Sequence, residues 1–181
     1  MVQEDNPQDG AAARLHQLAE YFREHPVEGP VEGHSASRSA PAPLSLATLD
    51  HIQASVNEVI AHTRGANPEA GPAPSRADAV YDWCREHTEH ADETVQQRRD
   101  TIEYRQYLEH ALRAGDKLVI RKQRCPECRT WGLMWQRDMQ AALCTNTDCV
   151  DNDGFSHTFT LARLAHEHVT ARTKIRQART T

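Results

Sequence analysis

Four of the five cysteines in this chain of 181 residues fall in two close pairs in its C-terminal third. Cys125-Pro-Glu-Cys128 and Cys144-Thr-Asn-Thr-Asp-Cys149 together give the spacing Cys-x2-Cys-x15-Cys-x4-Cys. A gap of two residues allows one tight turn to present two thiolates to a single ion, and zinc takes four such ligands at about 2.3 Å in a tetrahedron. The pattern therefore predicts one structural Zn²⁺ bound by Cys125, Cys128, Cys144 and Cys149.

Other uses of paired cysteines fit the sequence less well. A thioredoxin-like redox pair opens a helix after a strand, whereas Cys128 is followed by Trp-Gly-Leu-Met-Trp at residues 131–135, which predicts a strand. An iron–sulfur cluster also takes four cysteines, but the ferredoxin spacings are absent. Zinc is favoured over both alternatives, and over two unrelated groups of free thiols.

Four thiolates would fill the coordination sphere of zinc and leave no position for a reactive water. The sequence also shows no combination of nucleophile, base and oxyanion donor, and no phosphate-binding glycine loop. We therefore expect a protein that is not an enzyme. Metal binding would stabilise a chain in which only 38% of the residues are hydrophobic.

The two cysteine pairs and the predicted strands beside them resemble zinc ribbons over about residues 117–160. The resemblance implies a small antiparallel sheet with two turns, or knuckles, that clamp the metal at one end. The second knuckle departs from the usual gap of two residues, which predicts a wider turn in which Thr145, Asn146 and Thr147 satisfy the sulfurs. Together with the helical region and the segment that begins at Thr160, the chain also resembles small bacterial and phage zinc-ribbon proteins of unassigned function, which implies no activity.

The chain before Gly115 has the apolar spacing of amphipathic helices. The predicted helices are residues 10–25, residues 45–63 with Ser45 as N-cap, a third helix from Ser75, and residues 92–113. The third helix carries a capping box, Ser75-x-x-Asp78, and continues into the fourth either unbroken or with a kink near Asp92. Gly115 is the expected stop.

After Gly115 the pattern becomes that of short strands. The predicted strands are residues 117–124, 130–136, 139–143 and 157–160. In the second of them Trp131, Leu133 and Trp135 alternate on one face. From Leu161 the spacing is helical again, and one amphipathic helix is favoured over a helix-turn-helix at residues 160–177, because the turn has no glycine.

These elements predict an α+β fold, with an N-terminal helical region of three or four helices followed by a C-terminal antiparallel zinc ribbon capped by a helix. The predicted division is an N-terminal helix (1–25), a flexible linker (26–44), an acidic helical domain (45–115), the ribbon (116–160) and a basic C-terminal helix (161–181). The linker is predicted because it has almost no bulky apolar residue to offset the entropy of ordering.

Charge is divided unevenly along the chain. Residues 1–112 carry 9 Lys/Arg and 19 Asp/Glu, a net charge of −10, whereas residues 113–181 carry 12 and 7, a net charge of +5. Basic side chains near Trp131 and Trp135 could contact phosphates while the rings stack on bases, although the rings could equally pack inside the protein. The candidate nucleic-acid residues are Arg121, Lys122, Arg124, Arg129, Arg163, Arg172, Lys174 and Arg176. Two partner classes stay open, DNA or RNA at these residues and a protein partner at the acidic helical region.

Two further groups of side chains could in principle bind metal. Cys84, His87 and His90 follow one another at intervals of three, but a solvated polar face with a packed Cys84 is favoured. The second group follows the last cysteine and consists of His157, His166 and His168. We expect these three to be surface or hydrogen-bonding groups.

No run approaches the roughly 18 to 20 apolar residues of a membrane span, and the chain begins with the acidic segment Met-Val-Gln-Glu-Asp. We therefore expect a cytoplasmic protein with no membrane segment. In a reducing compartment paired cysteines more often bind metal than form disulfides.

Overall fold

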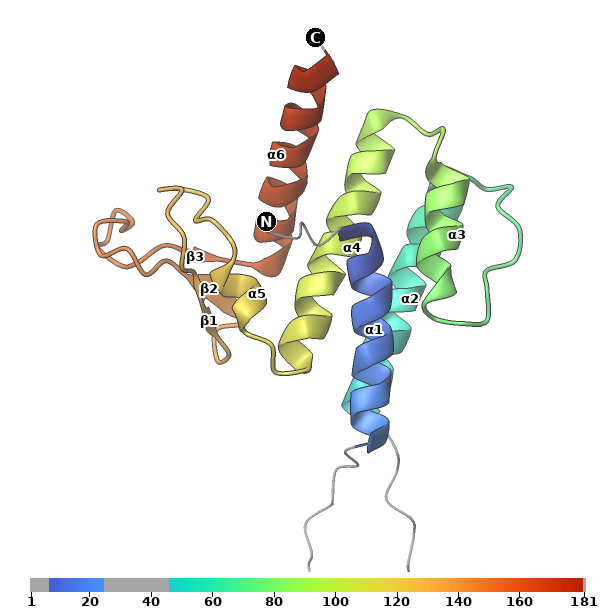
Figure 1. Ribbon diagram of the computed structural model, residues 1–181, viewed down its shortest axis with the longest axis horizontal. Coiled ribbons are helices and arrows are strands. Elements are labelled where there is room, and N and C mark those ends of the chain that lie inside the picture. Colours follow the sequence, from blue (N-terminus) through green and yellow to red (C-terminus); the bar gives the residue numbers. More distant parts are fainter. Residues whose placement is uncertain (1–6, 25–45, 181) are drawn as a thin grey trace, which may run out of the picture.

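The computed structural model describes residues 7–24 and 46–180, and Figure 1 shows how their elements are arranged. The elements are α1 (Pro7–Glu24), α2 (Leu46–Ala66), α3 (Ala79–Thr88), α4 (Glu93–Arg113), α5 (Leu118–Arg121), β1 (Met134–Gln136), β2 (Ala141–Leu143), β3 (Thr158–Phe159) and α6 (Leu161–Thr180). The predicted combination of a helical N-terminal part with a small antiparallel sheet is confirmed. The predicted linker at 26–44 and the N-cap Ser45 lie outside the described residues.

Helix α4 lies between the other long helices, with α1, α2 and α3 on one side and α6 on the other (Figure 1). We call α1 to α4 the helical body. Its hydrophobic cluster consists of Ala11, Leu15, Val59, Val80, Tyr81, Trp83 and Cys84. A second cluster joins α4 to the sheet and to α6, and includes Tyr104, Leu108, Ala111, Ile120, Leu133, Ala142, Phe159, Leu164, Ala165 and Val169. Ile102 and Tyr107 of α4 pack against the first cluster, so both clusters depend on α4.

A chain of buried and half-buried hydrogen bonds joins three helices of the helical body. His51 Nε2 of α2 lies 2.9 Å from His110 Nδ1 of α4, and His110 Nε2 lies 3.2 Å from the hydroxyl of Tyr81 in α3. The Tyr81 hydroxyl donates to Gln106 Oε1 at 2.7 Å, and Gln106 Nε2 donates to the carbonyl of Ser55 at 3.1 Å. Because these polar groups are paired with one another, they can be buried, and their geometry fixes how α2, α3 and α4 are oriented.

Two helix boundaries differ from the prediction. Helix α3 begins at Ala79, and Asp78 makes no capping hydrogen bond through its side chain, so the predicted capping box from Ser75 is wrong. Helix α4 is separate from α3, because Asp92 has an extended backbone and its carboxylate accepts the N–H of Val95 at 2.9 Å. An N-cap of this kind satisfies a free backbone amide and starts a new helix.

Gly115 ends α4, as predicted. It has a φ of 85°, and the N–H groups of Gly115 and Asp116 donate to the carbonyls of Leu112 at 3.1 Å and Ala111 at 2.9 Å. This pattern satisfies the last carbonyls of the helix and requires a left-handed residue, which glycine supplies without strain.

The predicted strand at residues 117–124 is wrong, because residues 118–121 form the single helical turn α5. Val119 and Ile120 are both buried in the second cluster. Adjacent residues of a strand point to opposite faces, whereas adjacent residues of a helical turn can share one side. The β-branched residues favoured a strand, but burial against α4 favours the helical turn.

The sheet has three short antiparallel strands in the order β1-β2-β3. Trp135 pairs with Ala142, and Ala142 pairs with Phe159, so the three side chains share one face. Ala142 and Phe159 belong to the second cluster, and Trp135 packs against it. The strands lie inside three of the predicted ranges but are shorter. The prediction that Trp131 lies on the same face as Trp135 is wrong, because Trp131 precedes the strand and its side chain is 59% exposed.

Helix α6 is continuous, so the helix-turn-helix alternative for residues 160–177 is wrong. It runs antiparallel to α4, because Gln97 donates to the Thr170 hydroxyl at 3.1 Å while Gln177 donates to Glu93 Oε1 at 2.7 Å. No helix in the described part of the chain is long and apolar enough to cross a membrane.

The pair of histidines between α2 and α4 makes stability sensitive to acid. Burial lowers the pKa of His51 to about 4 and that of His110 to about 3, whereas both groups have a pKa of about 6.5 in an unfolded chain. The unfolded state therefore binds more protons below pH 6.5. The contribution of the two histidines to stability is at its full value above that pH and falls as the pH drops toward 4, by up to about 1.4 kcal/mol per pH unit for each histidine before screening by solvent is allowed for.

We expect His51→Gln to be less stable than the wild type at neutral pH, because the hydrogen bond to His110 is weakened. The difference in free energy of unfolding should shrink by about 1 to 2 kcal/mol at pH 5, because the wild type alone has the cost of keeping His51 neutral, and the higher figure is reduced by the screening of this half-buried ring by solvent. Urea unfolding at both pH values measures this difference. Burial also raises the pKa of Glu103 to about 7, but Glu103 is present in both proteins, so its effect on the pH dependence of stability cancels in the difference. A difference that does not change with pH would contradict a neutral His51 in the folded state.

Candidate metal centre

The first cysteine pair sits in a tight turn after α5. The N–H of Arg129 donates to the carbonyl of Cys125 at 3.0 Å, and the N–H of Cys125 donates to the carbonyl of Thr130 at 2.9 Å. Arg129 has a φ of 62°, a left-handed conformation that glycine adopts more easily than arginine. The turn folds the chain back, so that Cys125 and Cys128 contribute sulfurs to one group.

The second pair lies in a wider turn after β2. The N–H of Cys149 donates to the carbonyl of Asn146 at 3.0 Å, and the Thr145 hydroxyl donates to the carbonyl of Gly132 at 2.7 Å. Gly132 has a φ of 104°, and a Cβ at this position would lie 3.3 Å from Thr145 Oγ1. Glycine therefore allows the segment after the first turn to approach the turn that carries Cys144 and Cys149.

The four sulfurs all lie within 4.8 Å of one another. Cys125 Sγ is 3.8 Å from Cys149 Sγ, and Cys128 Sγ is 3.7 Å from Cys144 Sγ. Four sulfurs at about 2.3 Å from a central zinc lie about 3.8 Å apart along each edge of the tetrahedron. Both short distances join one turn to the other, so an ion at the centre would tie the two turns together.

The sulfur cluster is suited to a divalent cation. Cys125, Cys144 and Cys149 are buried, and Cys128 is half-buried. Burial raises the pKa of the Cys144 and Cys149 thiols, whereas a hydrogen bond from Thr130, whose Oγ1 is 2.9 Å from the sulfur, lowers the pKa of Cys128 to about 6. Thiolates held this close repel one another, and a cation offsets that repulsion. Four soft thiolates suit zinc and leave no position for water.

Backbone amides also contact the sulfurs. The N–H of Thr130 hydrogen-bonds to Cys128, and the N–H of Asn146 hydrogen-bonds to Cys144. In each turn the donor lies two residues after the cysteine. Asn146 thus contacts a sulfur as predicted, but the hydroxyl of Thr145 donates to the backbone instead, so that part of the prediction is wrong.

The other metal-ligating side chains lie apart from this centre. Within residues 7–24 and 46–180, the four cysteines are the one group placed to hold a metal ion. Cys84 is buried in the helical body, and His87 Nδ1 lies 2.9 Å from the carbonyl of Trp83. The interpretation of Cys84 as a packed hydrophobic residue therefore holds.

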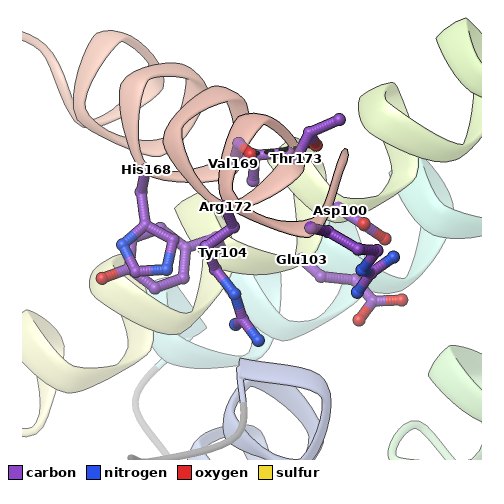
Figure 2. Close-up of a pocket in the computed structure, with 8 residues that line it drawn as sticks. Asp100, Glu103, Tyr104, His168, Val169, Arg172 and Thr173 are labelled. Carbon is purple, nitrogen blue, oxygen red and sulfur yellow. Dashed lines mark hydrogen bonds between the residues drawn. The ribbon is translucent and has the colours of Figure 1, made fainter. Parts of the chain in front are cut away.

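A cleft between α4 and α6 was not predicted (Figure 2). His168, predicted to be a surface or hydrogen-bonding group, is half-buried and stacks on Tyr104 with ring centroids 3.7 Å apart. Glu103 and Arg172 also line the cleft, whose volume is about 470 Å³ with its open mouth included. Glu103 Oε1 and His168 Nε2 are buried and have no hydrogen-bond partner among the described residues. Tyr104 and His168 come from different helices, so no spacing in the sequence connects them.

The predicted nucleic-acid residues divide into two groups. Arg172 and Arg176 line the cleft beside α4. Arg129 and Arg163 lie at the first turn and at the start of α6, and both pair with Glu167, at 3.6 Å and 2.9 Å. All eight are exposed. The group near the first turn and the start of α6 consists of Arg121, Lys122, Arg124, Arg129 and Arg163, and Lys174 lies with Arg172 and Arg176 farther along α6.

Elemental analysis of the purified protein tests the metal centre. We expect one equivalent of zinc per chain, and we expect Cys144→Ser to lose most of it because three thiolates do not complete the tetrahedron. The variant should also melt at a lower temperature, since structural zinc is worth on the order of 10 kcal/mol to a site of this type.

Cys84→Ser is the matched control, because it makes the same substitution at a buried cysteine of the helical body. It should keep one equivalent of zinc. A folded Cys144→Ser protein that retains a full equivalent would contradict a four-cysteine site, and iron together with sulfide in the wild type would identify an iron–sulfur cluster instead.

Comparison with known proteins gives no relative from which the role of this site could be inferred, so its interpretation depends on its geometry. No family model, no curated protein and no solved structure matches the chain. The structure brings the four cysteines together in a group that can hold one metal ion.

Proposed function

We propose that this protein is a non-enzymatic zinc-ribbon protein that binds nucleic acid, in the manner of a transcription-associated accessory protein. One structural Zn²⁺ on the four cysteines holds the two turns together, and basic side chains beside the first turn contact phosphates. The observation that carries this proposal is the exposed pair of Trp131 and Arg124 next to the cysteine cluster.

The proposed zinc supports the fold more than it supports chemistry. The strands contain only two or three residues each, and a sheet this small needs other support to be stable. A metal that ties both turns together supplies it. With four sulfur ligands the ion has no open position at which to activate water or polarise a substrate.

The two tryptophans of the predicted second strand have different surroundings. Trp135 packs against the second cluster, which favours a structural role for it. Trp131 belongs to neither hydrophobic cluster. The guanidinium carbon of Arg124 lies 4.2 Å from the centroid of the Trp131 ring. An exposed aromatic ring beside an arginine offers a surface for a base together with a charge for a phosphate.

The basic side chains beside this ring are linked to one another by hydrogen bonds and ion pairs. Arg124 Nη1 donates to the carbonyl of Arg129 at 3.2 Å, and Arg129 is linked to Arg163 through Glu167. Four thiolates and one Zn²⁺ would reduce the net charge of residues 113–181 from +5 to about +3. Because the earlier part of the chain is strongly acidic, a polyanion would be directed toward the cysteine end of the molecule.

Fluorescence anisotropy with a labelled oligonucleotide tests this proposal. We expect binding that weakens as salt is added, because neutralised phosphates release their counterions. The double variant Arg121→Ala/Lys122→Ala should bind less tightly, and the slope of log affinity against log salt should fall by roughly 1 to 2.

The control is Arg64→Ala/Arg98→Ala, which removes two exposed charges from the helical body. It should bind like the wild type. If the wild type shows no binding to DNA or RNA at low salt, the proposal is wrong, and the alternative of a protein-interaction adaptor that uses the acidic helical region is favoured.

A further inference from the structure

We infer that Trp131 and Arg124 form a binding site for single-stranded nucleic acid, in which one unpaired base stacks on the indole ring and Arg124 contacts a neighbouring phosphate. This inference rests on the proposed function. It adds to that function the kind of nucleic acid that is bound and the two residues that select it.

The backbone holds the ring in place from both sides of the first turn. Arg124 and Trp131 form an antiparallel bridge, and the next pair inward is joined by the N–H of Cys125, which donates to the carbonyl of Thr130 at 2.9 Å. Cys125 and Cys128 lie between them and contribute sulfurs to the cluster. A side chain on such a backbone loses little conformational freedom when a ligand binds.

The ring has surface left for a planar ligand. Arg124 lies over the ring, yet Trp131 is still 59% exposed. The guanidinium of Arg124 is kept beside the ring by its hydrogen bond to the carbonyl of Arg129. The site therefore combines an aromatic face with a fixed positive charge. Proteins that bind single-stranded nucleic acid use the first to stack on bases and the second to contact the phosphate backbone.

A duplex fits this surface less well than a single strand. Bases in a duplex are stacked on their neighbours, so a base can reach an aromatic ring only after unstacking, which is costly. Proteins that recognise duplexes usually insert a helix or a β-ribbon into a groove. Helix α6 packs its apolar face against α4 and the sheet, and its exposed Arg172 and Arg176 lie at the edge of the cleft beside α4, away from Trp131 along the helix.

The test measures anisotropy with labelled oligo-dT and oligo-U strands of about 12 nucleotides, and with a duplex of the same length. Trp131→Ala should lower the affinity for the single strands about 5- to 100-fold without changing the salt slope. Trp131→Phe should retain most of the affinity. Arg124→Ala should reduce the salt slope by roughly 0.7. Metal content and melting temperature show that each variant is folded.

Intrinsic fluorescence provides a second measurement that does not depend on affinity. A stacked base should quench the emission of Trp131 in the wild type, and Trp131→Phe should remove this quenching although Trp83 and Trp135 still emit. The inference is overturned if Trp131→Ala binds single strands as tightly as the wild type, or if the duplex binds as tightly as the single strands. Salt-dependent binding in those cases leaves the proposed function intact, whereas a wild type that binds no oligonucleotide removes both.

Discussion

The structure of the C-terminal half depends on the convergence of four sulfurs from two turns that are separated by a β-hairpin. Cys125 and Cys128 precede β1, and Cys144 and Cys149 follow β2, so the cluster closes the open end of the hairpin. The strands are too short to be stable through their own hydrogen bonds. The same closure fixes the ends of the first turn, where Arg124 and Trp131 lie. Stability of the sheet and presentation of the proposed binding surface therefore have one physical cause.

Features that depend on neighbours in the chain could be predicted from the sequence. The cysteine spacing indicates one common site because tight turns bring nearby residues together, and the structure places all four sulfurs in one group. Gly115 marks the end of α4 because a left-handed residue is needed there and glycine supplies it. The long helices follow from apolar residues repeated on one side of the chain.

Features that depend on distant parts of the chain could not be predicted in this way. Val119 and Ile120 favour a strand by their β-propensity. Both are buried on the same side, against a cluster that includes residues of α4, and a helical turn can place two adjacent side chains on one side. The stacking of His168 on Tyr104 joins two helices that no local pattern connects. Alternation along a strand predicts one face for Trp131 and Trp135, yet the strand begins only after Trp131, so the alternation does not apply to it.

Helix α4 contributes side chains to both hydrophobic clusters, and Tyr107 packs against both. A cut after Gly115 would thus separate each part of the molecule from apolar surface that it shares with the other. The helical body and the cysteine-bearing sheet should consequently melt in a single cooperative transition, so that loss of a metal ion bound by the four cysteines would loosen helices that make no contact with it.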